Sequence, residues 1–219
     1  MSYIAITGAG TGLGAALAKQ YAANDNTIYL LGRTEDRLLS VKREIEEQGG
    51  VASVVVCDVT DPSSVEEAMT QMPKLDVLIN NAGLGIFGPV QELSPSDINQ
   101  MLNTNVKGTI YMTQSALPRL TESGGRILNM ISTAGLRGKV NESVYCASKF
   151  AQRGFTESLQ KELAETSTSV TAVYMGGMNT PFWDGSEHVS NPSKLKDPST
   201  VAQIIFDQDD GRQEIKVDQ

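Results

Sequence analysis

A cluster of glycines near the start of the chain constrains the fold more than any other feature of the sequence. The apolar residues 3–7 are typical of a buried strand, and the apolar positions from Ala15 to Tyr21 have the spacing of a helix. Between them lie Gly8, Gly10, Gly12 and Gly14. A glycine turn at the start of a helix leaves backbone N–H groups accessible at the positive end of the helix dipole, where a pyrophosphate can bind. The glycine spacing alone also fits a turn that binds nothing.

Strand-like and helix-like segments alternate along the rest of the chain. We expect strands over residues 27–31, 52–57, 75–80, 125–131, 169–175 and 214–217. We expect helices over 35–48, from 61 onwards, from 94 onwards, and over 103–120, 143–165 and 198–206. Because parallel strands need a crossover that returns over the sheet, this alternation predicts an α/β, doubly wound Rossmann fold with a mostly parallel sheet of about seven strands.

No linker or internal repeat interrupts the pattern, so residues 1–219 are expected to form one dinucleotide-binding domain. In such a domain ligands bind at the carboxyl ends of the strands. Lys and Arg number 18 against 26 acidic residues, a net charge of −8, and this balance disfavours nucleic acid and anionic membranes as partners. Cys57 and Cys146 have no metal-type spacing and are too few for a disulfide framework. With no room for a signal peptide before the first strand and no membrane-length apolar run, we expect a cytoplasmic protein.

Polar residues with catalytic chemistry follow the fifth expected strand. Ser132 comes directly after it, and Tyr145 and Lys149 are spaced i and i+4, which places them on one face of a helix. A phenol keeps its proton until a pH of about 10, but a nearby ammonium favours the phenolate and lowers that pKa. A tyrosine of this kind can exchange the proton of a carbinol near neutral pH. Taken singly, the same residues also fit a packing tyrosine, a solvated lysine and a serine that caps a turn.

Together, these motifs resemble the short-chain dehydrogenase/reductase family over nearly the whole chain. The family's TGxxxGxG motif is matched by Thr7, Gly8, Gly12 and Gly14, and its NNAG signature by residues 80–83. Its asparagine corresponds to Asn105, and its serine, tyrosine and lysine correspond to Ser132, Tyr145 and Lys149. The resemblance implies cofactor contacts from Gly8, Thr11, Gly12, Leu13, Gly14, Arg33, Asp58, Val59, Asn81, Ala82, Gly83, Tyr145, Lys149, Gly176 and Thr180.

The resemblance also implies a role for each catalytic residue. Ser132 is expected to bind the substrate oxygen and Tyr145 to transfer the proton. Lys149 is expected to hold the nicotinamide ribose and to lower the pKa of the tyrosine. Asn105 is expected to connect Lys149 to solvent through water. These roles imply hydride chemistry at a CH–OH or C=O carbon, with a nicotinamide cofactor as the redox agent.

The end of the second strand indicates which form of the cofactor is bound. NAD sites place an acid on the ribose 2′-hydroxyl about 20 residues after the glycines, but Gly32 stands near that position. Arg33 follows and can pair with a 2′-phosphate. We therefore expect NADP(H), with NAD(H) as the alternative. Alternatively, Arg33 is a solvent-exposed charged residue of a loop and does not contact the cofactor.

The carboxyl-terminal part departs from the family pattern. Gly176 and Thr180 match the family's PGxxxT, but Met175 stands where the family has proline. Loss of the proline would make this loop less stiff; alternatively, Met175 is a residue of the hydrophobic core. Residues 181–197 are expected to form a short substrate loop. Trp183 in it is read equally as a substrate contact or a loop anchor, and His188 is expected to be an exposed loop residue.

The function predicted from the sequence is an NADP(H)-dependent oxidoreductase that acts on a small carbonyl or alcohol compound, with Tyr145 as acid and base. The alternatives are a non-catalytic NADP(H)-binding sensor or interaction module, and an epimerase or dehydratase. The helices at 103–120 and 143–165 correspond to those that pair between subunits in the family, so we expect a homodimer or homotetramer.

Overall fold

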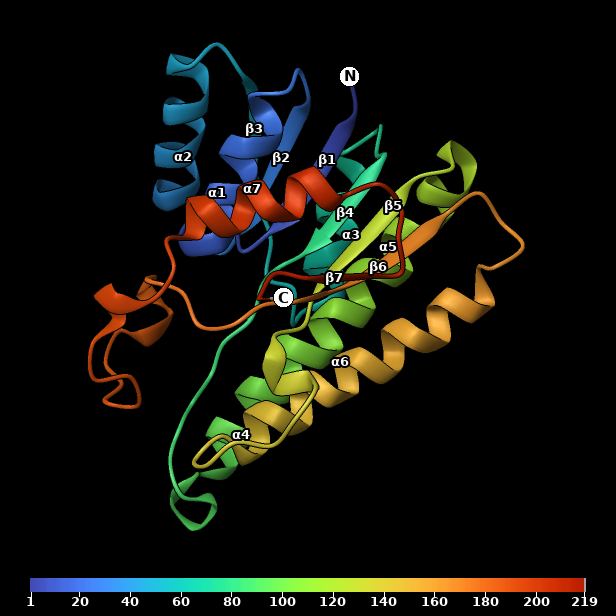
Figure 1. The fold of residues 1–219 in the computed structure, drawn as a ribbon. Coiled ribbons are helices and arrows are strands. Elements are labelled where there is room, and N and C mark those ends of the chain that lie inside the picture. Colours follow the sequence, from blue (N-terminus) through green and yellow to red (C-terminus); the bar gives the residue numbers. More distant parts are fainter. Residues whose placement is uncertain (219) are drawn as a thin grey trace.

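The computed structural model describes residues 1–218 and contains seven parallel strands in one twisted sheet (Figure 1). The strands are β1 (Tyr3–Thr7), β2 (Thr27–Gly32), β3 (Val51–Val56), β4 (Val77–Asn80), β5 (Arg126–Met130), β6 (Ser169–Tyr174) and β7 (Glu214–Lys216). Their order across the sheet is β3-β2-β1-β4-β5-β6-β7. Every pair of neighbours is parallel, which confirms the predicted doubly wound α/β class and makes the sheet wholly parallel.

Helices cover both faces of this sheet. They are α1 (Gly12–Ala22), α2 (Glu35–Glu47), α3 (Pro62–Thr70), α4 (Pro95–Leu102), α5 (Thr109–Ser123), α6 (Ser143–Glu162) and α7 (Pro198–Gln208). Apolar residues of α1, α2 and α7 form one core cluster with the sheet, and those of α3, α5 and α6 form a second. Among residues 1–218, no helix combines the length and the apolar character needed to cross a bilayer.

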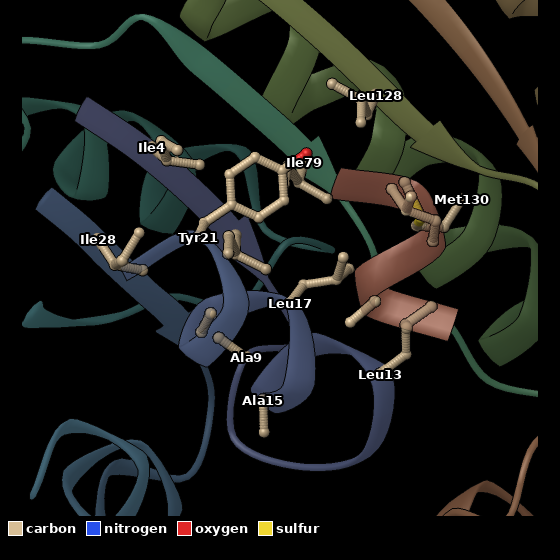
Figure 2. Close-up of a cluster of buried hydrophobic side chains, with 14 of the residues drawn as sticks. Ile4, Ala9, Leu13, Ala15, Leu17, Tyr21, Ile28, Ile79, Leu128 and Met130 are labelled. Atoms are coloured by element: carbon tan, nitrogen blue, oxygen red, sulfur yellow. The ribbon is translucent and has the colours of Figure 1, made fainter. Parts of the chain in front are cut away.

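The first core cluster fixes α1 against the strands that lead to the glycine turn. Figure 2 shows Leu17 and Tyr21 of α1 lying beside Ile4 of β1 and Ile79 of β4, and all four are at most 1% exposed. Strands buried on both faces become almost continuously apolar, which explains why the strand segments lack an alternating pattern. The glycine turn is therefore held by a helix and two strands that cannot shift without opening the core.

Local capping explains where several helices begin. Asp61 caps α3 by accepting a hydrogen bond from the Ser63 N–H, as its position before Pro62 predicts. Ser94 and Asp97 form a capping box at the start of α4. The helix expected over 103–120 instead begins with a π-helical segment, Asn103–Gly108, and continues as α5 to Ser123. A π turn of this kind often marks a functional site, and Asn105 lies within it.

The order in which strands are added to the sheet reverses between β1 and β4: β2 and β3 lie on one side of β1, and β4 to β7 lie on the other. The loops that follow β1 and β4 therefore diverge to opposite faces and leave a crevice at the carboxyl ends of the strands. The residues after β5 and β6 reach the same edge, because the parallel register brings the ends of all these strands together. The expected ligand position is therefore next to the glycine turn.

Candidate active site

A cavity of about 510 Å³ opens at this edge of the sheet. The predicted site residues that line it are Gly8, Thr11, Gly12, Leu13, Gly14, Arg33, Asp58, Val59, Asn81, Ala82, Gly83, Ser132, Tyr145, Lys149, Gly176 and Thr180. Asn105 is the one predicted site residue that is absent from the lining; it is fully buried behind the wall. The structure therefore brings together, in one cavity, residues that are up to 172 positions apart, from Gly8 to Thr180 (180 − 8).

The glycine turn has the shape needed to receive phosphates. Gly8 and Gly12 have φ angles of +65° and +54°, a backbone conformation that side chains disfavour. A Cβ on Gly14 would overlap the carbonyl oxygen of Gly8 and would lie 2.6 Å from Nδ2 of Asn81. The Thr11 side chain does not cap α1, so it does not compete for the N–H groups of the first turn. The residues present thus fit the pyrophosphate of a dinucleotide.

The segment after β4 is tied to this turn. Oγ1 of Thr7 accepts hydrogen bonds from the backbone N–H groups of Asn81 and Ala82, both at 2.9 Å. Nδ2 of Asn81 donates to the Thr7 carbonyl oxygen, also at 2.9 Å. The side chain of Asn80 instead points into the core, where its Nδ2 donates to Asn129 and Thr113. The first asparagine of the NNAG signature is thus structural, and the second joins two walls of the cavity.

One end of the cavity carries charges suited to an adenosine phosphate. Oδ1 of Asp58 is fixed by hydrogen bonds from the N–H and hydroxyl of Thr60, at 2.9 and 2.8 Å. Arg33 lines the cavity as predicted, and so does Arg37, which the sequence reasoning missed. The available signal was a second arginine in the first turn of the helix that follows Arg33. No ion pair among residues 1–218 involves either guanidinium.

The other end carries the predicted catalytic side chains. Ser132 has a φ of +86°, a strained conformation for a residue other than glycine, and its Oγ accepts a hydrogen bond from the Ala134 N–H. Tyr145 and Lys149 lie one turn apart on α6 and are 8% and 5% exposed. Nζ of Lys149 is 5.8 Å from the centre of the Tyr145 ring. The two side chains therefore face the same cavity, as the i, i+4 spacing predicts.

Burial controls the protonation of both groups. It raises the pKa of Tyr145 well above the usual value of a phenol, while the nearby Ser132 hydroxyl opposes this rise and Glu142 adds to it. Burial also lowers the pKa of Lys149 to about 7. The expectation that Lys149 makes the phenol more acidic is therefore not met in this structure, because burial is the largest influence on the pKa of Tyr145 and raises it.

The segment after β6 reaches over the glycine turn. Met175 is 4% exposed and belongs to the first core cluster, which settles its reading in favour of a core residue. The Gly176 N–H donates to Oδ2 of Asp218 at 2.6 Å. A Cβ on Gly12 would lie 3.2 Å from Cβ of Thr180, so the Thr180 side chain packs directly against the turn.

The expected substrate loop is anchored by aromatic contacts. Nε1 of Trp183 donates to the Met178 carbonyl oxygen at 2.9 Å, and its ring stacks on Phe87. His188 also stacks on Phe87, with 4.5 Å between ring centres, and its Nε2 lies 2.9 Å from Oε1 of Glu142. The prediction that His188 is an exposed loop residue was wrong: its side chain is 20% exposed because it packs between Phe87 and Glu142. Sequence reasoning missed both of these partners.

Comparisons with known proteins agree with this geometry. Residues 2–190 match the family model for short chain dehydrogenases. An uncharacterized oxidoreductase of Staphylococcus epidermidis is 32% identical over 206 residues, which cover 92% of this chain and 88% of the relative. Sepiapterin reductase of Chlorobaculum tepidum is 31% identical over 190 residues, covering 81% and 78%. An alcohol dehydrogenase from the archaeon Thermococcus sibiricus, solved in complex with 5-hydroxy-NADP, has a TM-score of 0.90 at 27% identity, covering 99% of this chain and 95% of that one.

The fold and the glycine-lined cavity define a dinucleotide-binding protein of the doubly wound class. Within that class, the chain belongs to the short-chain dehydrogenase family. This confirms the resemblance found in the sequence, and with it the expected kind of enzyme, an NAD(P)-dependent oxidoreductase.

Proposed function

We propose that this protein is an NADP(H)-dependent oxidoreductase that interconverts a small carbonyl compound and its alcohol, with Tyr145 as acid and base. One observation supports this most strongly: a single cavity joins the glycine turn and Arg33 at one end to Ser132, Tyr145 and Lys149 at the other. A dinucleotide with its phosphates on the turn would extend along the cavity toward the buried phenol.

Each catalytic side chain has one task in this mechanism. Ser132 donates a hydrogen bond to the carbonyl oxygen and stabilises the negative charge that develops there. Tyr145 donates its phenolic proton to the same oxygen, which completes the alcohol, and regains a proton from solvent through the open cavity. Lys149 binds the ribose hydroxyls of the cofactor. When bound, NADPH would supply a hydride whose electron pair forms the new C–H bond, while the π electrons of the carbonyl move to the oxygen that receives the proton of Tyr145.

The protonation state of Tyr145 suits its role as the acid in carbonyl reduction. Burial raises the pKa of Tyr145, so its phenol keeps the proton at neutral pH and is ready to donate it. In the oxidative direction the same residue must first lose that proton, which burial opposes. Tyr145 is therefore in the protonated form that reduction of a carbonyl compound requires.

The choice of NADP(H) over NAD(H) rests on two guanidinium groups and gives a first prediction. Arg33 and Arg37 face the same end of the cavity and can both pair with a 2′-phosphate. We expect Arg33→Ala to reduce the preference for NADPH over NADH, measured as a ratio of kcat/KM values, by about 10- to 100-fold, the equivalent of one charge-assisted hydrogen bond. The double variant with Arg37→Ala should lose more.

A matched control lies on α2, the helix that also carries Arg37. Arg43 is exposed on α2 and does not line the cavity, so Arg43→Ala should leave the cofactor preference unchanged. An unchanged preference in the Arg33→Ala, Arg37→Ala double variant would show that the 2′-phosphate is recognised elsewhere or not at all.

We propose a cytoplasmic protein in which residues 1–219 form one dinucleotide-binding domain with a substrate loop at about 181–197.

We also propose a homodimer or homotetramer that assembles through α5 and α6. Phe150 of α6 supports this, because it is 43% exposed despite its apolar side chain. Trp183 and Phe182 line the cavity next to Tyr145, so we assign them to the substrate end.

A screen for NADPH oxidation with a panel of aldehydes and ketones tests the proposed function. The absorbance of NADPH at 340 nm should fall with at least one compound and stay constant without any. A protein that binds NADPH but oxidises it with no member of a broad panel would instead support the non-catalytic sensor. An epimerase or dehydratase would convert its substrate with no net loss of NADPH.

A further inference from the structure

A buried glutamine connects Lys149 to the π-helical segment. Gln152 lies on α6, three residues after Lys149, and is 1% exposed. Its Oε1 accepts a hydrogen bond from Nζ of Lys149 at 2.7 Å, and its Nε2 donates to Oγ1 of Thr109 at 2.7 Å. A buried amide that satisfies both of its polar ends is held in one orientation.

Thr109 completes the connection to Asn105. Its hydroxyl donates to the backbone carbonyl oxygen of Asn105 at 2.9 Å. The Asn105 side chain is engaged separately, because its Nδ2 donates to the Leu84 carbonyl oxygen and to Oγ of Ser148, while its Oδ1 accepts from the Leu84 N–H. Gln152 and Thr109 thus connect Lys149 to the backbone carbonyl of Asn105 in the π-helical segment.

The chemistry of an amide determines what this link can do. Glutamine accepts through its oxygen and donates through its nitrogen, so it cannot exchange one proton between its two partners as a water molecule does. A second acceptor, the carbonyl oxygen of Met130, lies 3.0 Å from Nζ of Lys149. These two contacts use two of the three N–H donors of the ammonium, and Lys149 also lines the cavity.

We propose that Gln152 is a positioning residue that fixes the Lys149 ammonium, so that its remaining N–H is directed to the cofactor ribose. This inference rests on the proposed function for what Lys149 binds, but the contact between Gln152 and Lys149 is independent of it. Gln152 and Thr109 hold Lys149 in place through hydrogen bonds between buried side chains.

Titration of Lys149 is the direct readout of this contact. Burial is the cause of its pKa of about 7, and no carboxylate contributes to that shift among the described residues. Tyr145 is the titratable side chain beside it, 5.8 Å from Nζ to the ring centre. In protein labelled with [¹³C]lysine, the Lys149 signal should titrate near pH 7, clearly apart from the exposed lysines at about 10.4.

Two variants at Gln152 should shift this titration in opposite directions. Gln152→Glu keeps the acceptor and adds a negative charge facing Nζ, so the pKa of Lys149 should rise by about one unit or more. Gln152→Met keeps the length but removes the acceptor, so the pKa of Lys149 should fall further. Gln160→Met, two turns later on α6 and outside the cavity lining, should leave the titration unchanged.

Cofactor affinity gives the second readout. The Kd for NADPH should rise about tenfold in Gln152→Met, the equivalent of one charge-assisted hydrogen bond, and should be close to the wild-type value in Gln152→Glu. A Lys149 pKa that is the same in wild type and Gln152→Glu would overturn the inference, even if Gln152→Met folds poorly. Wild-type protein that does not bind NADPH would overturn the proposed function and would leave the titration result intact.

Discussion

Tyr145→Phe should lower kcat for carbonyl reduction by roughly 10²- to 10⁴-fold, the usual contribution of a positioned general acid. The substitution removes one oxygen atom and leaves the ring, which packs against Phe87 and Phe182 with ring centres 5.4 and 5.9 Å away. Folding and NADPH binding should therefore stay close to wild type. Stopped-flow measurement of NADPH oxidation, beside fluorescence titration of NADPH binding, separates the two effects.

A second tyrosine provides the matched control. Tyr111 is half-buried on α5 and does not line the cavity, so Tyr111→Phe should retain full turnover. Turnover that survives in Tyr145→Phe would exclude the phenol as the proton donor. If the protein is instead a non-catalytic NADP(H)-binding sensor, its response to NADPH binding should be the same in wild type and in Tyr145→Phe.

Gly14→Ala should damage both stability and cofactor binding. The added Cβ would meet the Gly8 carbonyl oxygen and the Asn81 side chain, which is itself held by Thr7. The turn would have to open, at a cost of about 3 kcal/mol, as for severe overpacking of a core. For a chain of this size that corresponds to a fall in Tm of about 6–12 °C. Loss of roughly two charge-assisted backbone hydrogen bonds to phosphate should weaken NADPH binding about 100-fold.

The same substitution at another glycine shows whether this effect belongs to the turn. A Cβ on Gly138 would meet no atom within 4 Å, and Gly138 is exposed and outside the cavity lining. Gly138→Ala should therefore change stability by less than about 0.5 kcal/mol. Calorimetry and NADPH titration of both variants measure the comparison. Wild-type affinity in Gly14→Ala would mean that the phosphates do not bind against the turn.

The sequence predicted the parts of the site that depend on local geometry. The i, i+4 spacing of Tyr145 and Lys149 fixes their shared face once a helix forms, and glycines after an apolar run require a tight turn before α1. The alternation of strands and helices predicted the sheet, because parallel strands have few ways to connect. These inferences need only neighbouring residues and general rules of topology.

The sequence could not predict features that arise from contacts across the fold. The contact between His188 and Glu142 joins residues 46 positions apart, and nothing in either neighbourhood indicates it. Gln152 is an ordinary polar residue of a helix until the packing of α5 brings Thr109 to its amide. The raised pKa of Tyr145 depends on how completely the surrounding loops exclude water, which no spacing of residues determines.

A crystal structure of the protein with bound NADP⁺ would test the central claim most directly. The claim is that one cavity places the phosphates on the glycine turn and the reacting carbon beside Tyr145. We predict that the pyrophosphate lies against the start of α1, the 2′-phosphate lies between Arg33 and Arg37, and the nicotinamide ring lies next to Tyr145. A dinucleotide bound elsewhere, or one whose nicotinamide points away from the Tyr145 hydroxyl, would contradict it.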